Sequence, residues 1–181
     1  VLLKILAEKI HDARFLRLIK HLLQAGYLEE WRYHTTLSGA PQGGIVSPIL
    51  SNIYLDQLDH FMETTLIPQY TRGQKRQENP DYRHTLQQVA KARKKGEHQQ
   101  AQKLLRLAQH LPSKDPNDPT YRRLRYIRYA DDMLLGFSGT RAEAEQIKLH
   151  LGVYLQETLK LELSQEKTLI THAHQQAARF L

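Results

Sequence analysis

Hydrophobic residues recur at every third or fourth position along three stretches of the chain, a spacing that predicts amphipathic helices. Two core-building helices are expected in residues 1–25, with Asp12 as the N-cap of the second. A long buried helix should begin with Ser47 as N-cap and Pro48 in its first turn, and it should end at Pro68. The apolar positions of these helices are Leu2, Leu3, Leu6, Ile10, Phe15, Leu16, Ile19, Leu22, Leu23, Leu50, Ile53, Tyr54, Leu58, Phe61, Met62 and Leu66.

Strand patterns occur mainly in the second half of the chain. Residues 125–129 and 133–137 are separated only by Ala130-Asp131-Asp132, which predicts a β-hairpin with two adjacent carboxylates at its tip. A capping box at residues 140–143 should open a helix near 141–159. Two short strands are expected at 161–163 and 167–171, and extended structure at 27–37. Helices and strands mix without a βαβ rhythm, so the expected fold class is α+β.

A polar, basic segment separates the long helix from the hairpin. Its pattern predicts helices over about 83–95 and 97–111, with Gly96 at the turn and few apolar residues on either helix. Prolines at 112–119 then return the chain to the body. The expected division is a body made of residues 1–71 and 112–181 and an inserted basic αα-hairpin at 72–111.

The charge of the chain is concentrated in this region. The 181 residues carry a net charge of +7, but residues 72–128 hold 15 Lys and Arg against 5 Asp and Glu, which leaves 11 against 14 elsewhere. This distribution favours an arm that contacts RNA or DNA, with a merely solvated basic arm as the alternative. The absence of cysteine excludes disulfides and thiolate metal sites, and no apolar run is long enough to span a membrane. Because the chain starts at Val1 rather than Met, we expect it to be part of a longer protein.

The adjacent carboxylates are the main candidates for chemistry. Two like charges at a tight turn repel each other unless a cation lies beside them. Oxygen ligands of this kind suit Mg²⁺, and paired Mg²⁺ ions serve in-line phosphoryl transfer in polymerases and nucleases. An ordinary polar turn is the alternative, because Asp is a preferred turn residue.

The surrounding motifs support the metal interpretation. Tyr129-Ala130-Asp131-Asp132 between two apolar strands, with Pro41-Gln42-Gly43 upstream and opening a helix, resembles the palm of a reverse transcriptase. The block at 37–55 is similar to one found in group II intron reverse transcriptases, also called maturases, and the segments at 161–168 and 178–181 match the two blocks that follow it. The basic insert resembles one seen in the chloroplast-like subset of these proteins. The implied architecture is a polymerase palm, with some fingers, whose antiparallel sheet packs on helices.

The resemblance also implies roles for individual residues. Asp131 and Asp132 hold two Mg²⁺ ions, with Mn²⁺ as an alternative metal, and Tyr129 lies against the primer end or the nascent base pair. Lys167 is placed near the leaving pyrophosphate, although a solvated lysine at a strand start is the alternative. The residues expected to shape the nucleotide and template pocket are Pro41, Gln42, Gly43 and Ala130, and those expected to contact RNA from the arm are Lys91, Arg93, Lys94 and Lys95.

The function implied is RNA-directed DNA synthesis by a group II intron protein, with maturase activity in splicing. Its partners would be intron RNA as template, a DNA primer or target, and deoxynucleotides, with no membrane and with a homodimer left open. The expected location is the cytoplasm of a bacterium or an organelle of a eukaryote. A non-catalytic RNA-binding maturase and a reverse transcriptase from a retron, a diversity-generating element or a defence system remain alternatives. The family's first metal-binding aspartate, its thumb and some of its fingers are not expected in this segment, so the segment alone should not polymerise.

Overall fold

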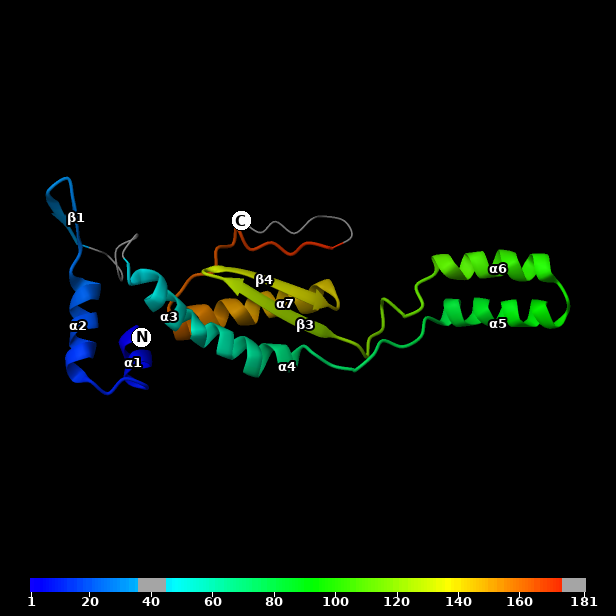
Figure 1. The fold of residues 1–181 in the computed structure, drawn as a ribbon, viewed down its shortest axis with the longest axis horizontal. Coiled ribbons are helices and arrows are strands. Elements are labelled where there is room, and N and C mark those ends of the chain that lie inside the picture. Colours follow the sequence, from blue (N-terminus) through cyan, green and yellow to red (C-terminus); the bar gives the residue numbers. More distant parts are fainter. Residues whose placement is uncertain (36–44, 174–181) are drawn as a thin grey trace.

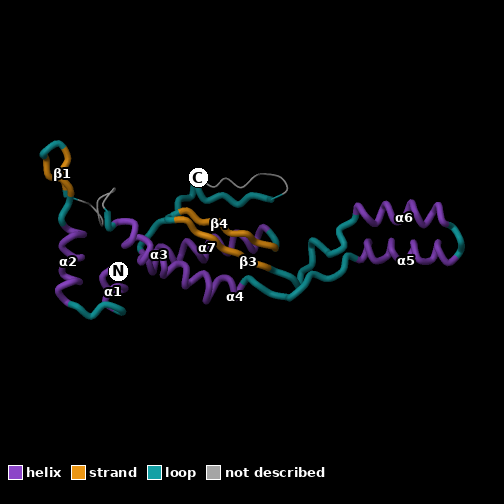
Figure 2. Tube along the Cα trace, viewed as in Figure 1, coloured by secondary structure: helices purple, strands orange, loops and turns teal. Residues whose placement is uncertain are grey.

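The computed structural model describes residues 1–35 and 45–173, which form an elongated molecule with a helical arm at one end (Figure 1). The expected mixture of helices and antiparallel strands is confirmed (Figure 2). The motif Pro41-Gln42-Gly43 and the closing motif at 178–181 lie outside the described residues. Within the described ranges, no helix has the length and hydrophobicity needed to cross a bilayer.

The N-terminal part contains two helices and a small hairpin. Helix α1 (Leu2–Ala7) is followed by α2 (Ala13–Gln24), and a carboxylate oxygen of Asp12 accepts from the backbone N–H of Arg14 at 2.7 Å and of Phe15 at 3.2 Å. The predicted N-cap is therefore confirmed. Strands β1 (Tyr27–Glu29) and β2 (Arg32–His34) pair antiparallel within the segment expected to be extended.

The long helix differs from the prediction at both ends. Helix α3 (Ser47–Phe61) includes Ser47 in its first turn, and the N-cap position belongs to Val46, whose backbone is already helical. The chain continues through a π-helical segment η1 (Met62–Leu66) into α4 (Ile67–Gln69), one residue beyond Pro68. Proline lacks an N–H and crowds the preceding turn. The wider π turn just before Pro68, in which Ile67 N–H bonds to the carbonyl of Met62, allows the helix to continue.

The main core lies between this helix and the predicted β-hairpin. Strands β3 (Arg123–Tyr129) and β4 (Asp132–Ser138) pair antiparallel, and α7 (Arg141–Tyr154) with its π-helical extension η2 (Leu155–Leu159) packs with α3 on one face of them. The Thr140–Glu143 capping box is present, as predicted. The buried core residues are Leu55, Leu58, Met62, Leu66, Leu124, Ile147, Leu151, Leu155 and Leu159.

The basic segment forms the predicted helical hairpin. Helices α5 (Pro80–Lys94) and α6 (His98–His110) lie side by side and project away from the body (Figure 1). Gly96 has φ +79° at the turn, a conformation that favours glycine. A small core of Val89, Ala92 and Ala101 holds the two helices together. We call residues 73–121 the arm, because the backbones of Arg72 and Arg122 pair with each other at its root.

The two short strands expected at 161–163 and 167–171 do not form. The segment is irregular, with a turn at 165–167 in which the carbonyl of Ser164 accepts from Thr168 N–H at 3.0 Å. Leu161 and Leu163 pack against the main core, which explains the alternating pattern. Among the described residues no strand pairs with this segment, and side-chain alternation alone does not make a ladder.

Candidate active site

The carboxylates of Asp131 and Asp132 lie at the tight turn between β3 and β4. Tyr129 pairs directly with Asp132, so Ala130 and Asp131 form a two-residue turn, and Ala130 adopts φ +53°. Asp132 is therefore the first residue of β4 rather than part of the loop. Both carboxylates are exposed, and neither forms a hydrogen bond or an ion pair with the described residues. Their negative charge faces solvent, and no cation from residues 1–35 or 45–173 pairs with it.

The hairpin has one covered face and one open face. Alternation along β3 and β4 directs Leu124, Tyr126 and Arg128 toward the helices, and Ile127, Tyr129 and their partners away from them. On this open face Tyr129 is 76% exposed, Ile127 62% and Leu134 41%. The open face thus presents a small apolar surface directly beside the side chain of Asp132.

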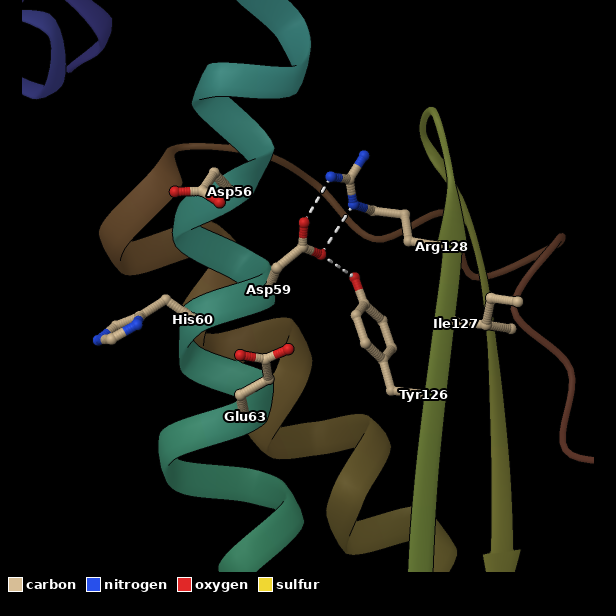
Figure 3. A pocket seen from close by; sticks show the side chains of 7 residues that line it. All are labelled: Asp56, Asp59, His60, Glu63, Tyr126, Ile127 and Arg128. Atoms are coloured by element: carbon tan, nitrogen blue, oxygen red, sulfur yellow. Dashed lines mark hydrogen bonds and ion pairs between the residues drawn. The ribbon is translucent and has the colours of Figure 1, made fainter.

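Arg128 connects the carboxylate turn to α3 from the covered face (Figure 3). Its guanidinium donates to Asp59 at 2.9 Å and 2.5 Å, and to the carbonyl of Ala130 within the turn at 2.6 Å. It also donates to the side-chain oxygen of Asn52 at 3.2 Å, and the hydroxyl of Tyr126 donates to Asp59 at 2.7 Å. Arginine can sustain these contacts together because its donors form a rigid planar fork. The turn is thereby held to the long helix by a charged, hydrogen-bonded clamp.

The clamp shifts the proton affinities of its members. The hydrogen bond from Arg128 outweighs burial and lowers the pKa of Asp59, while burial and the bond to Asp59 raise the pKa of Tyr126. The carboxylate of Asp59 therefore stays ionised and Tyr126 stays protonated at neutral pH. An open hollow of about 390 Å³ adjoins the clamp and is lined by Asp56, Asp59, His60, Glu63, Tyr126, Ile127 and Arg128. Four of these residues are Asp, Glu or His, but no group of three or more such side chains in the described residues is arranged so that it could hold a metal ion.

Sequence reasoning missed the clamp. Two signals were present: Arg128 is a charged residue at an inward-facing position of an alternating strand, and Asp59 is an acid in a mostly apolar helical stripe. Each implies a partner of opposite charge. The pairing itself joins residues 69 positions apart, which a local pattern does not indicate.

The donor set at the turn suits a hard divalent cation. Asp131 and Asp132 offer only oxygen ligands, and Mg²⁺ is usually bound by one or two carboxylates while it keeps several waters or substrate oxygens. The two exposed side chains leave space for those further ligands. They therefore fit the Mg²⁺ expected from the sequence, although the described residues alone do not form a complete site.

The remaining predicted residues lie apart from the turn. Lys167 is exposed in the turn after η2, where its backbone N–H lies 3.4 Å from the hydroxyl of Ser164. The four arm residues predicted to contact RNA are all exposed, on the last turns of α5 or just after it: Lys91, Arg93, Lys94 and Lys95. The structure thus brings together Tyr129, Ala130, Asp131 and Asp132 at one end of the hairpin. The arm is attached at the opposite end of the hairpin, and the four cations lie at the far end of α5 (Figure 1).

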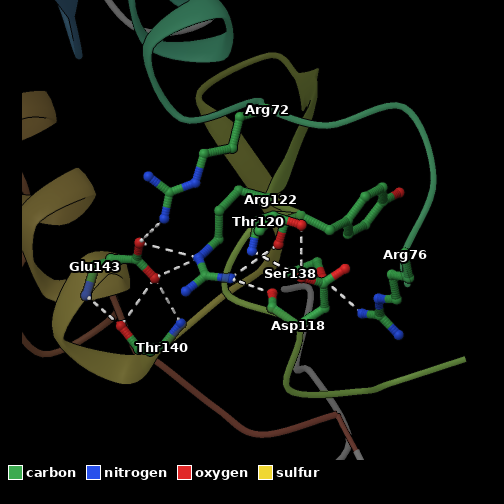
Figure 4. A network of polar contacts seen from close by, with 9 residues as sticks. Arg72, Arg76, Asp118, Thr120, Arg122, Ser138, Thr140 and Glu143 are labelled. Carbon is green, nitrogen blue, oxygen red and sulfur yellow. Dashed lines mark hydrogen bonds and ion pairs between the residues drawn. The ribbon is translucent and has the colours of Figure 1, made fainter. Parts of the chain in front are cut away.

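A second polar network fixes the root of the arm (Figure 4). Glu143 accepts from Arg122 at 2.7 Å and from Arg72 at 3.3 Å, and it completes the capping box with Thr140. Asp118 accepts from the backbone N–H of Gln77 at 2.7 Å, and this bond joins the segment that leads into the arm helices to the segment that returns from them. Sequence reasoning identified the capping box but not these tertiary bonds. The arm therefore has a defined attachment to the body.

A family profile and several known proteins of one type match this chain. The profile of the family described as "Reverse transcriptase (RNA-dependent DNA polymerase)" matches residues 1–181. The chain is 41% identical to the group II intron-encoded protein LtrA of Lactococcus lactis, over 96% of the chain and 30% of that protein. It is 37% identical to a COX1/OXI3 intron 1 protein of Saccharomyces cerevisiae, over 100% of the chain and 21% of the relative. It is 30% identical to nuclear intron maturase 2, mitochondrial, of Arabidopsis thaliana, over 71% of the chain and 15% of that protein.

Proposed function

The chain belongs to the reverse transcriptase (RNA-dependent DNA polymerase) family, as a reverse transcriptase domain of the group II intron-encoded type, and on this basis we propose its activity. The protein that carries it is an RNA-directed DNA polymerase that copies intron RNA from a primer 3′-hydroxyl and deoxynucleotides. It also assists splicing of the same RNA. The observation that carries the proposal is the pair of unneutralised carboxylates at the β3–β4 turn, which lie beside an open apolar face.

The residues of the turn have separate roles in this proposal. Asp131 and Asp132 hold two divalent ions, Mg²⁺ or alternatively Mn²⁺, with Asp131 as the principal ligand. Such ions stabilise the attacking and leaving oxygens of an in-line displacement at the α-phosphate. Tyr129 contacts the primer end or the nascent base pair with its exposed ring. The clamp through Arg128 holds the backbone of the turn from which these side chains project, which favours a preorganised site.

Other residues complete the pocket. Lys167 supplies a cation near the departing pyrophosphate, where it stabilises developing negative charge. Pro41, Gln42 and Gly43, together with Ala130, shape the space for the template base and the incoming nucleotide. The support for these assignments is the resemblance of their motifs to those of the family.

The arm is the proposed contact to intron RNA. Lys91, Arg93, Lys94 and Lys95 are exposed at the distal end of α5, in a hairpin that projects from the body. Exposed cations on a projecting element can neutralise phosphates without disturbing the body. We infer that residues 72–111 are an insert of the chloroplast-like type in a palm made of residues 1–71 and 112–181.

Substitution of the carboxylates tests the polymerase. In the full-length protein, Asp131→Ala with Asp132→Ala should abolish cDNA synthesis on an RNA template. Glu157→Gln is a matched control, because it also removes an exposed negative charge and lies on η2. Continued cDNA synthesis by the double variant would contradict the proposed role of the turn.

A splicing cofactor without polymerase activity is the second candidate, and the basic arm favours it. A splicing assay with the same carboxylate variant separates the two functions. Splicing that persists while cDNA synthesis is lost shows that the functions reside in separate surfaces. If the unsubstituted protein promotes splicing but makes no cDNA, the non-catalytic candidate is correct.

A further inference from the structure

A lysine on α7 holds the turn that carries Lys167. The side-chain ammonium of Lys148 donates to the backbone carbonyl of Thr168 at 2.7 Å, in a partly buried position. Within the turn, the carbonyl of Ser164 accepts from Thr168 N–H at 3.0 Å, so both backbone polar groups of Thr168 are bonded. Among the hydrogen bonds of the described residues, the bond from Lys148 is the one that joins residues 164–168 to another element.

The segment before this turn runs back along α7. Lys160 ends η2 in the left-handed conformation, with φ +56°, and Leu161 N–H donates to the carbonyl of Leu155 at 2.9 Å. A left-handed residue commonly ends a helix and redirects the chain. Leu163 then lies next to Gly152 of α7, because a Cβ added to this glycine would be 4.0 Å from the leucine side chain. The chain therefore reverses after η2 and passes α7 in the opposite direction.

The two contacts between this segment and α7 differ in kind. Gly152 and Lys148 are four residues apart, so they lie one above the other on the same face of the helix. The contact of Leu163 is apolar and belongs to the main core, and hydrophobic contacts are not directional. The bond from Lys148 to Thr168 is charge-assisted and directional. Lys148 is thus the contact that specifies where along α7 the turn is held.

The beginning of the segment is joined to the same part of α3 as the carboxylate turn. The hydroxyl of Tyr54 donates to the carbonyl of Leu159 at the end of η2. Asn52, two residues earlier on α3, accepts from Arg128 at 3.2 Å, and Arg128 donates to the carbonyl of Ala130 at 2.6 Å. The carboxylate turn and the end of η2 are therefore braced by one stretch of α3. The position of the later turn along α7 then sets its place relative to the carboxylates.

We propose that Lys148 is a positioning residue for nucleotide incorporation, because it sets the place of Lys167 and thereby the distance of that cation from the departing pyrophosphate. This role rests on the proposed polymerase function and on the part of Lys167 in it. The primer 3′-oxygen bonds to the α-phosphorus, the bond from that phosphorus to the bridging oxygen breaks, and the electron pair leaves with pyrophosphate, while the hydroxyl proton passes to water. A correctly placed cation stabilises the charge on the leaving group, and a displacement of about 1 Å can cost up to about 100-fold in rate.

Hydrogen exchange in the full-length protein tests the contact. Lys148→Met keeps most of the length of the side chain and its helix preference but removes the charged donor. The amides of residues 164–168 should exchange about tenfold faster, while those of α7 stay protected. Lys148→Arg retains a charged donor and should restore the exchange of the unsubstituted protein. Arg141→Gln is the matched control, because it removes a highly exposed charge from the same helix and should leave the turn unchanged.

Dependence on the leaving group tests the positioning role. Single-turnover incorporation is measured with natural deoxynucleotides and with analogues that have a difluoromethylene, fluoromethylene or methylene bridge between the β- and γ-phosphates, whose leaving groups become more basic in that order. Lys148→Met should slow incorporation of the natural nucleotide about tenfold and that of the methylene analogue by a larger factor, because a poor leaving group depends more on the cation. Lys167→Met should show the same selective loss, and the double variant should lose no more than Lys167→Met alone.

A merely structural role of Lys148 would slow all analogues by one factor, and that result would overturn the proposal. Equal exchange at the turn in Lys148→Met and the unsubstituted protein would overturn it too, as would single losses that multiply in the double variant. Selective loss in Lys148→Met that Lys148→Arg restores would support it. Absence of incorporation by the unsubstituted protein would instead refute the polymerase proposal, and the exchange measurement would still decide whether Lys148 holds the turn.

Discussion

The clamp between Arg128 and Asp59 should control the geometry of the carboxylate turn, and Asp59→Asn is the sharpest perturbation of it. The substitution keeps the shape of the side chain but removes the charge that faces Arg128. Asparagine has a single acceptor oxygen, so one of the two guanidinium bonds, at 2.9 Å and 2.5 Å, is lost and the other loses its ionic character. The bond from Arg128 to the carbonyl of Ala130 remains possible but is no longer braced from α3.

The free-energy cost of Asp59→Asn can be estimated from the exposure of Asp59 and Arg128. Removing one partner of a fully buried ion pair costs about 3–5 kcal/mol, and an exposed pair contributes about 0–1 kcal/mol. The side chain of Arg128 is 11% exposed and that of Asp59 is 29% exposed, so an intermediate cost of about 2 kcal/mol is expected. If this cost is borne by local opening, amide exchange at the turn should accelerate roughly 30-fold. A displaced turn should also slow nucleotide incorporation by about 10- to 100-fold.

Hydrogen exchange and single-turnover incorporation in the full-length protein measure both effects. Glu63→Gln is the matched control, because Glu63 lines the same hollow and is exposed, but it is not part of the clamp. Faster exchange confined to the β3–β4 turn and α3, with slower incorporation, is the expected result for Asp59→Asn. If exchange and incorporation match those of Glu63→Gln, the clamp does not position the turn and the reasoning fails.

Three further predictions concern the root of the arm, the pH dependence of the clamp and the cations of α5. Because burial of Glu143 is outweighed by hydrogen bonds from Thr140 and Arg122, its pKa is lowered, and Glu143→Gln should increase hydrogen exchange at the arm root while the β3–β4 turn stays protected. The pKa of Asp59 is also lowered from 3.8, so its stabilising effect is present above that pH and is lost as the pH falls through its folded-state value; acid titration followed by circular dichroism should show this loss in the unsubstituted protein and not in Asp59→Asn. Neutralising Lys91, Arg93, Lys94 and Lys95 should lower the slope of log affinity for intron RNA against log salt concentration by about one for each lost phosphate contact. An unchanged slope would show that the arm is only a solvated element.

Local patterns predicted most elements of the fold. The Asp12 cap, the capping box at Thr140, the turn at Gly96 and the two strands around Asp131 each depend on residues within a few positions of one another. Backbone preference and side-chain spacing act at that range, so the sequence contains the necessary information. The carboxylate tip of the hairpin was predicted for the same reason.

Long-range pairings and strand partners were not predicted. The strands expected after Lys160 failed because a strand needs a neighbour to supply hydrogen bonds, and alternation at Leu161 and Leu163 reflects packing instead. The bonds of Arg128 to Asp59 and of Arg122 to Glu143 depend on how the helices dock, which periodicity does not specify. The candidate site was therefore predicted from its motif, while the contacts that hold its turn are seen only in the structure.

The root of the arm also bears on how such proteins can diversify. Arg72 and Arg122 exchange both backbone hydrogen bonds, at 3.0 Å and 2.9 Å, so the chain leaves the body and returns to it at a single point. Loop-closure entropy rises only about 0.6 kcal/mol for each doubling of the length between such points. Insertions, deletions or whole replacements within residues 73–121 therefore place little strain on the strand that continues to the carboxylate turn. A module attached in this way, here the proposed RNA contact, can change from one relative to another while the proposed catalytic turn stays the same.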